Sequence, residues 1–335
     1  MSDNISSALS IISWNVRGLN DPDRCAAINE TLGASTCTIA CLQESKLEQL
    51  DGATAAFLGG YRLRGFALLP ATGTRGGIVV LWDENIVQAS DITLGSFCIS
   101  LTIKTMQDDF SFRLTSVYGP TASSQKEDFF FRADCSKPAQ GVKWMVNGDF
   151  NQIQRARDKN KRTFNRCRIA RFRVTLQTCE LNEIPLQNRR FTWSNERISP
   201  TLSKLDGVFC NHECDIAFSD HILHALSSSL SDHCPLLFAS ARGPRKPRSF
   251  KFENYWVKLP GFNEVMASSW AEPIAHSEPC HVLYHKLARA AKSLRHWGRS
   301  FSSNGKLQLH MAFEVILRFD EAQDFRPSLP GGERH

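Results

Sequence analysis

Short apolar segments separated by turn residues follow one another from residue 11 to about residue 240. Several of these segments are rich in Val, Ile, Phe and Trp, which favours β-strands. The clearest predicted strands cover 11–16, 38–43, 77–82, 96–103, 110–118, 143–146 and 205–209.

Two stretches between these strands have helical spacing instead. Residues 23–32 follow Asp21-Pro22, a pair suited to the cap and the first turn of a helix. In 168–181, apolar residues recur at the helical period. Because strands and helices are mixed along the chain, the pattern predicts an α/β or α+β domain.

The pattern changes after residues 243–248, a basic connector interrupted by prolines. Beyond it, residues 281–301 have helical spacing and an apolar face. This face comprises Leu283, Leu287, Ala290 and Leu294. We therefore expect a disordered N-terminus (1–9), a main domain (10–240), and a basic linker with a partly helical connector region (241–335).

The composition narrows the class of protein. Of 335 residues, 42% are hydrophobic, which is enough to bury a large core. No secretory leader is visible, and no apolar run approaches the roughly 20 residues of a membrane span. We therefore expect a protein of the cytosol or nucleus without a membrane partner.

The eleven cysteines are odd in number and have no framework spacing, so reduced core thiols are expected rather than disulfides. Cys210-x-His212-x-Cys214 could suggest zinc. Structural zinc sites favour gaps of about two to four residues and a second, distant ligand pair. We therefore interpret the two cysteines as thiols packed near a strand end.

The formal charge of +6 is uneven along the chain. Residues 244–335 contain 14 Lys and Arg against 9 Asp and Glu, so most of the positive excess lies in the tail. The nearly neutral main domain can still bind a polyanion where its basic residues cluster, because the local field attracts phosphates.

Several apolar strands end in polar residues suited to metal or phosphate chemistry. These segments are 11–20, 41–46, 116–120, 145–151 and 231–235, and 204–206 opens a further strand. Strand ends of α/β domains converge at one edge, where ligands bind. The side chains expected to meet there are Asn15, Glu44, Tyr118, Asp149, Asn151, Asp206, Asp232 and His233.

The chemistry of these side chains indicates a site that binds a divalent cation and a phosphate group. Carboxylate oxygens without a thiolate partner favour Mg²⁺ or Mn²⁺ over zinc. A histidine beside carboxylates transfers protons or orients charge on a phosphoryl oxygen. Each segment alone is typical of a turn or a solvated strand end, whereas the ordered set is specific.

The ordered set resembles the exonuclease-endonuclease-phosphatase superfamily over about residues 10–240. Its motifs are Ser13-Trp-Asn-Val-Arg-Gly18, Leu42-Gln-Glu44, Val117-Tyr-Gly-Pro120, Gly148-Asp-Phe-Asn151, Ser203-Lys-Leu-Asp206 and Ser231-Asp-His233. Within the superfamily, Phe191-Thr-Trp-Ser-Asn195 followed by Ser203-Lys-Leu-Asp206 is similar to the endonuclease of plant LINE-type (non-LTR) retrotransposons. The tail resembles the connector that precedes reverse transcriptase in those elements, so that domain is the expected partner in a full-length element.

The resemblance implies a four-layer α/β sandwich of the DNase I type, with two mixed β-sheets flanked by helices. It also implies an Mg²⁺-dependent hydrolase that nicks DNA and leaves a 3′-hydroxyl. Glu44 would hold the Mg²⁺ or Mn²⁺ with help from Asn15 and Asp232.

The resemblance likewise implies the catalytic roles. Asp149 would orient or deprotonate the attacking water, with Asn151 beside it. His233, held by Asp206, would contact the scissile phosphate. Tyr118 would donate a hydrogen bond to a phosphate oxygen.

Basic and polar residues near these motifs are candidates for DNA contact. They are Arg17, Arg155, Arg157, Arg189, Arg190, Thr192 and Ser231. Phosphate contacts would position the strand without reading its sequence. In related endonucleases the hairpin region around 187–203 enters a DNA groove, and Trp193 within it is interpreted as a core residue.

Two other interpretations remain open. A phosphoesterase acting on RNA or phosphorylated small molecules would use the same strand-end residues, because the bond cleaved is the same. A retroelement relic would bind nucleic acid without catalysis. The nucleus is the expected location for a DNA substrate, and the cytoplasm is the alternative.

Arg17 stands where abasic-site endonucleases of the superfamily carry an acid. The departure removes a metal ligand and adds a phosphate-binding cation, so we predict a one-metal site without strong preference for abasic DNA. Comparing the nicking rates of plain and abasic duplexes tests this. Much faster nicking of the abasic duplex would contradict it.

Overall fold

The protein is described from a computed structural model. It covers residues 9–241 except 74, 108, 136 and 229, and in the tail 252, 256–257, 260–273, 279–280, 282–283, 285–294, 296–297 and 315–316. Residues 1–8, most of the segment expected to be disordered, lie outside the described residues. Leu9 is buried. The chain divides into two compact units, with all described residues up to Ala241 in the first and those from Phe252 in the second.

The first unit is built on two six-stranded sheets. The first sheet has the order β13 (His221–Ala225), β14 (Leu236–Ser240), β1 (Ser10–Asn15), β2 (Ile39–Gln43), β4 (Arg75–Trp82) and β3 (Gly65–Thr72). The second has the order β5 (Val87–Leu94), β6 (Cys98–Thr105), β7 (Ser111–Tyr118), β8 (Trp144–Asp149), β12 (Asp206–Cys210) and β9 (Asn182–Glu183). The β1–β2 and β7–β8 pairs are parallel and the other neighbours antiparallel, so both sheets are mixed.

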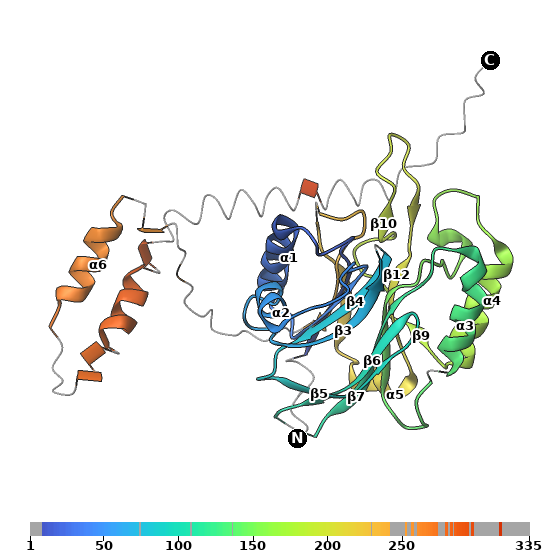
Figure 1. Cartoon of the computed structure of the whole chain (residues 1–335), viewed down its shortest axis with the longest axis horizontal. Coiled ribbons are helices and arrows are strands. Elements are labelled where there is room, and N and C mark those ends of the chain that lie inside the picture. Colours follow the sequence, from blue (N-terminus) through green and yellow to red (C-terminus); the bar gives the residue numbers. More distant parts are fainter. Residues whose placement is uncertain are drawn as a thin grey trace, which may run out of the picture. The chain divides into compact units, whose positions relative to one another are not determined.

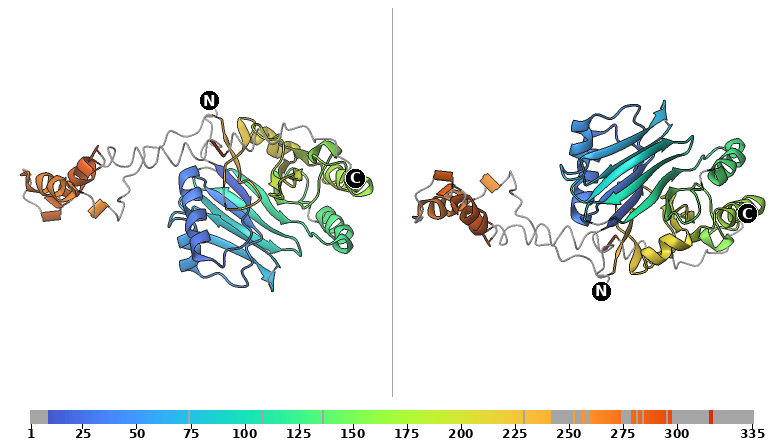
Figure 2. Two further views of the ribbon diagram at one scale, coloured as in Figure 1. Left: turned by 90° about the horizontal axis from the view of Figure 1, so that it is seen from above. Right: turned by 90° about the horizontal axis from the view of Figure 1, so that it is seen from below.

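Helices cover the outer face of each sheet, which gives four layers (Figures 1 and 2). The helices α1 (Pro22–Ser35) and α2 (Gly52–Leu58) pack on the first sheet, and α3 (Lys126–Cys135) and α4 (Arg166–Thr178) pack on the second. The short helix α5 (His212–Ala217) follows β12. The predicted DNase I-type sandwich is confirmed.

Alternating side chains of the strands fill the layers on either side. In β1, Ile11 belongs to the core between the sheets, whereas Ile12 packs toward α1 and α2. Residues of both sheets, including Val80 and Met145, complete the central core. Both faces of the central strands are buried, and this explains their nearly continuous apolar sequences.

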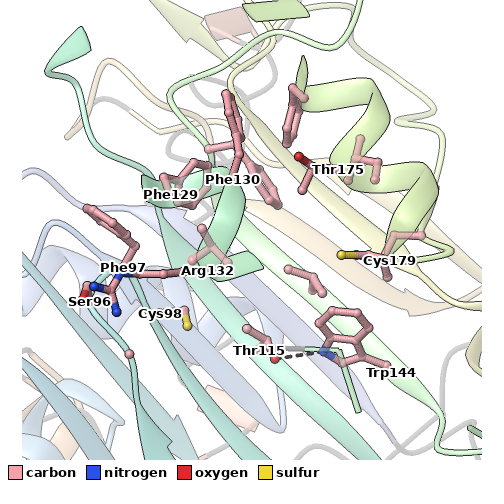
Figure 3. Close-up of a pocket in the computed structure, with 17 residues that line it drawn as sticks. Ser96, Phe97, Cys98, Thr115, Phe129, Phe130, Arg132, Trp144, Thr175 and Cys179 are labelled. Atoms are coloured by element: carbon pink, nitrogen blue, oxygen red, sulfur yellow. Dashed lines mark hydrogen bonds between the residues drawn. The ribbon is translucent and has the colours of Figure 1, made fainter. Parts of the chain in front are cut away.

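An aromatic layer lies between the second sheet and the helices α3 and α4 (Figure 3). The Trp144 indole donates a hydrogen bond to the Thr115 hydroxyl at 2.9 Å, and a cavity of about 210 Å³ opens beside them. Phe150 packs edge-on against Phe209 in this layer, with 5.0 Å between ring centroids. The layer therefore anchors the backbone directly after β8.

Every predicted strand is present, and so are both predicted helices. The Asp21 carboxylate caps α1 by accepting a hydrogen bond from the backbone N of Asp23 at 3.0 Å, with Pro22 in the first turn. The strands missing from the prediction include β3, β5, β13 and β14. Of these, β3, β5 and β13 are sheet edges, and β3 contains Pro70, which edge strands tolerate.

The predicted helical tail is confirmed for the described residues, which include α6 (Phe262–Ala271) and helical residues 285–294. Ala290 and Leu294 are buried, but Leu283 and Leu287 are about half exposed. Only the last two members of the expected apolar face are therefore buried. In the part of the chain that the structure describes, no helix has the length and apolar character of a membrane span.

The ten cysteines with described side chains are free thiols. The Cys210 and Cys214 sulfurs lie 3.4 Å apart and both residues are buried, which confirms the interpretation as packed thiols.

Gly148 in β8 has a φ of 137°, and a Cβ atom there would overlap the backbone oxygen of Val117. We predict that Gly148→Ala lowers the free energy of unfolding by about 3 kcal/mol or more, because strain and overlap add. The control Gly141→Ala has a φ of 85° and open space around the new methyl, so it should cost only about 1–2 kcal/mol. Urea denaturation measures both, and equal losses would contradict the prediction.

Candidate active site

The two sheets bring the predicted strand-end residues together at one edge. Asn15 ends β1, Tyr118 ends β7 and Asp149 ends β8. Glu44 follows β2 directly, and Asp206 opens β12 opposite Asp149 in the antiparallel register. Asp232 and His233 lie in the segment that enters β14.

The amide of Asn15 links a carboxylate of each sheet. Its Nδ2 donates hydrogen bonds to Glu44 Oε2 at 3.1 Å and to Asp149 Oδ2 at 2.9 Å. All three residues are buried. One neutral side chain therefore holds two like charges near each other and partly offsets their repulsion.

The backbone is left-handed at four non-glycine positions of the site, Arg17, Glu44, Lys46 and Asn151, with φ of 58°, 54°, 57° and 47°. Such conformations cost about 1–3 kcal/mol each and persist where surrounding contacts hold them. The backbone N of Arg17 donates to Asn15 Oδ1 at 3.1 Å, and that of Asn151 donates to Asp149 Oδ1 at 2.8 Å. The turns after β1 and β8 are thus held by the side chains that the strands present.

His233 and Asp206 form a buried hydrogen-bonded pair. His233 Nδ1 lies 2.9 Å from Asp206 Oδ2, and the Thr192 hydroxyl donates to the same carboxylate oxygen at 2.7 Å. Burial lowers the pKa of His233, but the carboxylates of Asp206 and Asp149 outweigh it and raise the pKa to about 9. The imidazole is therefore mainly protonated at neutral pH.

Asp149 faces the other side of the imidazole. Its Oδ2 lies 3.8 Å from His233 Nε2. Burial and the nearby Asp206 carboxylate raise the pKa of Asp149 to about 6, against the opposing effects of His233 and Asn15. Ligand atoms of Asp149, Asp206 and His233 all lie within 4.8 Å of one another, close enough to surround one ion.

Glu44 is surrounded by donors. Its Oε2 accepts a hydrogen bond from the Tyr118 hydroxyl at 3.1 Å and from Arg17 Nη1 at 3.3 Å. Lys46 Nζ lies 3.4 Å from the other oxygen. Burial and the Glu44 charge raise the pKa of Tyr118 far above its usual value, so this phenol remains a hydrogen-bond donor.

Arg17 and Asp232 form a two-point ion pair. Nε and Nη2 of Arg17 reach Asp232 Oδ1 and Oδ2 at 2.7 and 2.5 Å, and the Trp193 indole donates to Oδ2 at 2.8 Å. Burial opposes ionisation of Asp232, but these bonds lower its pKa below the ordinary value. The pair also raises the pKa of Arg17.

A model of the endonuclease/exonuclease/phosphatase family matches residues 12–233, which is more than half of the chain and contains all of these groups. The chain belongs to this family.

Similar solved structures agree with the fold. The endonuclease domain of TRAS1, a telomere-specific non-LTR retrotransposon, is 15% identical with a TM-score of 0.52, over 71% of this chain and 100% of that one. The AP endonuclease LMAP from Leishmania major is 18% identical with a TM-score of 0.50, over 69% of this chain and 86% of that one. The APE2 catalytic domain of Xenopus laevis is 17% identical with a TM-score of 0.50, over 71% of this chain and 94% of that one. No curated protein matches the chain significantly.

The donor set of this family member fits a hard divalent cation. Glu44, Asp149 and Asp206 are buried carboxylates at one place, and buried anions are stable only where cations or hydrogen bonds compensate them. Oxygen ligands of this kind suit Mg²⁺ or Mn²⁺. Asp232, expected to assist in holding the ion, instead has both oxygens bonded to Arg17 and Trp193.

Two expected DNA contacts have structural partners instead. Thr192 is 1% exposed, and its hydroxyl also accepts hydrogen bonds from the backbone N of Leu205 and of Asp206, so it supports the start of β12. The Ser231 hydroxyl donates to the backbone oxygen of Asn15 at 2.7 Å and accepts from the backbone N of His233 at 3.2 Å. Ser231 therefore joins the end of β1 to the histidine.

The arginines expected at the DNA interface besides Arg17 lie at the 3₁₀ helix Ala156–Asp158 and in an adjacent loop. Arg190 Nη2 donates to the backbone oxygen of Arg157 at 2.9 Å, and its guanidinium lies 5.0 Å from the Phe191 ring centroid. Arg155 pairs with Glu183 at 2.8 Å. Arg189 lines a polar cavity of about 290 Å³ that opens beside His233.

Three site residues were missed or misjudged from the sequence. Lys46 lies within the segment 41–46, but its ion pair with Glu44 was not predicted. Trp193, interpreted as a core residue, is partly exposed and bonded to Asp232. Lys126 at the start of α3 is buried and donates to the backbone oxygen of Asn151 at 2.8 Å, and burial lowers its pKa to about 8. No sequence pattern marked Lys126.

We predict that Thr192→Val lowers the free energy of unfolding by about 2–3 kcal/mol, because it removes one donor from Asp206 and leaves two backbone N–H groups without their acceptor. Thr192→Ser keeps the hydroxyl and should cost about 1 kcal/mol for the lost methyl. Urea denaturation distinguishes the two variants. A Val variant as stable as the Ser variant would show that the hydroxyl does not support this site.

Proposed function

We propose that the chain is a divalent-metal-dependent endonuclease that nicks DNA and leaves a 3′-hydroxyl, and that it serves a LINE-type retrotransposon of the plant kind. The observation that carries the proposal is the buried set of Asp149, His233 and Asp206, with Glu44 joined to it through Asn15. The similarity in fold to the TRAS1 endonuclease domain supports the retrotransposon assignment.

Hydrolysis of a phosphodiester needs an activated water, compensation of charge on the phosphoryl oxygens and a stabilised leaving oxygen. Asp149, with a pKa of about 6, is mainly ionised at neutral pH and is suited to accept a proton from water. His233, with a pKa of about 9, is suited to donate a hydrogen bond to a phosphoryl oxygen. Asp206 orients the imidazole, as the distance of 2.9 Å indicates.

The remaining groups position the substrate and the ion. Tyr118 offers its hydroxyl proton to a phosphate oxygen when it is not bonded to Glu44. Asn151 keeps Asp149 in place through its backbone N and its amide, at 2.8 and 3.2 Å. Glu44 and Asn15 would hold the Mg²⁺ or Mn²⁺, which supplies positive charge for the phosphate.

DNA would run past the polar cavity beside His233 and along the adjacent arginines. Arg155, Arg157 and Arg190 would contact the phosphate backbone. The hairpin of β10 (Trp193–Ser194) and β11 (Leu202–Ser203) extends beyond the sheets (Figure 1), with Ile198 fully exposed between its strands. We assign target preference to this hairpin. A nuclear location and a reverse transcriptase partner belong to the same proposal.

A supercoiled-plasmid nicking assay with Mg²⁺ tests the function. We expect the unchanged chain to convert plasmid to open circles, and Glu44→Gln and His233→Ala each to lower the rate about 100-fold or more. EDTA should abolish nicking, and ligation of the nicked product would verify a 3′-hydroxyl beside a 5′-phosphate.

Matched controls are Glu30→Gln and His212→Ala, which change the same residue types at exposed positions and should nick at the original rate. Equal nicking by all five proteins would indicate a contaminant. Cleavage confined to RNA or to inositol phosphates would replace DNA nicking with the phosphoesterase function. A folded chain without any hydrolysis would favour a nucleic-acid-binding relic.

A further inference from the structure

The guanidinium of Arg17 lies among the carboxylates, where the proposed function requires a cation. Two of its nitrogens bond both oxygens of Asp232, and the third lies 3.3 Å from Glu44 Oε2. The side chain is 39% exposed, so one side of it remains open to solvent. Its backbone is left-handed, and the amide of Asn15 holds it by a hydrogen bond to the Arg17 backbone N.

Lys46 lies on the opposite side of Glu44, with its Nζ 3.4 Å from Oε1. Each oxygen of Glu44 therefore faces a cation of the protein. Any divalent ion that uses Glu44 as a ligand must weaken or replace one of these two ion pairs. The cost is smaller at the Lys46 side. Among the residues that the structure describes, Lys46 pairs with no second carboxylate, whereas Arg17 also bonds Asp232 at two points.

The formal charges limit how many ions the site can hold. The site contains four carboxylates with a total charge of −4, those of Glu44, Asp149, Asp206 and Asp232. Arg17 and Lys46 contribute a charge of +2. One divalent ion brings these six described groups to neutrality, or to +1 when the protonated imidazole of His233 is included. A second ion would leave an excess of +2, or +3 with the protonated imidazole of His233, among mostly buried groups, which is unfavourable where the solvent cannot screen it.

We propose that the guanidinium of Arg17 takes the place of a second divalent ion, so that the site holds one ion. Arg17 also weakens the binding of that one ion, because it competes with the ion for Glu44. The inference deepens the proposed function and rests on it. It assigns Arg17 a role toward the metal ion in addition to any contact with DNA.

Binding of Mn²⁺ to the full chain tests the inference without measuring catalysis. Electron paramagnetic resonance of free Mn²⁺ gives the stoichiometry, and calorimetry gives the affinity. We expect one Mn²⁺ per unchanged chain, about tenfold tighter binding of one Mn²⁺ by Arg17→Gln, and two Mn²⁺ per chain for Arg17→Asp, which exchanges a cation for a ligand. Arg64→Gln removes the same charge at an exposed position and should bind Mn²⁺ as the unchanged chain does.

Circular dichroism verifies that each variant is folded, and Arg17→Gln suffices if Arg17→Asp does not fold. Two Mn²⁺ or none on the unchanged chain would overturn the inference, and so would an affinity of Arg17→Gln within twofold of the original. A chain that nicks DNA but holds two Mn²⁺ would refute the role of Arg17 and leave the proposed function intact. A chain that holds one Mn²⁺ and responds to Arg17→Gln as expected, but does not nick, would support the role and remove the function.

Discussion

The hydrogen bonds from the Asn15 amide to Glu44 and Asp149 join the two sheets at the point where the chemistry is concentrated. Glu44 directly follows β2 of the first sheet and Asp149 ends β8 of the second, so neither sheet alone could assemble the site. A neutral donor is suited to this position because it satisfies both carboxylates without adding charge. The arrangement of the remaining groups depends on this bridge, since Arg17 and Tyr118 bond to the same oxygen of Glu44.

Buried charge is the constraint that determines the partners of each group. Asp206 is compensated by His233 and by the Thr192 hydroxyl, and Asp232 by Arg17 and Trp193. Ionised groups removed from water are stable only with such partners. The network therefore combines stability with reactivity, because the bonds that compensate the charges also set the protonation of Asp149 and His233.

The central strands could be predicted because both of their faces are buried, so their sequences are almost continuously apolar. Edge strands such as β3 and β5 have one polar side or a proline and give no such signal. In the tail, helical spacing identified the helix but not which residues are buried, since Leu287 is exposed and Leu294 is not. Burial depends on what a helix packs against, and spacing along one segment contains no information about that.

The sequence by itself determined the order of the strand-end motifs, the acids and imidazole that they present, and the resemblance to the family. Only the tertiary structure decided which of these groups meet. Arg17 and Asp232 are 215 positions apart, Thr192 supports Asp206 from a neighbouring hairpin, and Lys126 reaches Asn151 from another layer. Such pairs form because β14 lies beside β1 in the first sheet, and because α3 and the segment before β10 reach the ends of strands in the second sheet. No single segment encodes which elements become neighbours.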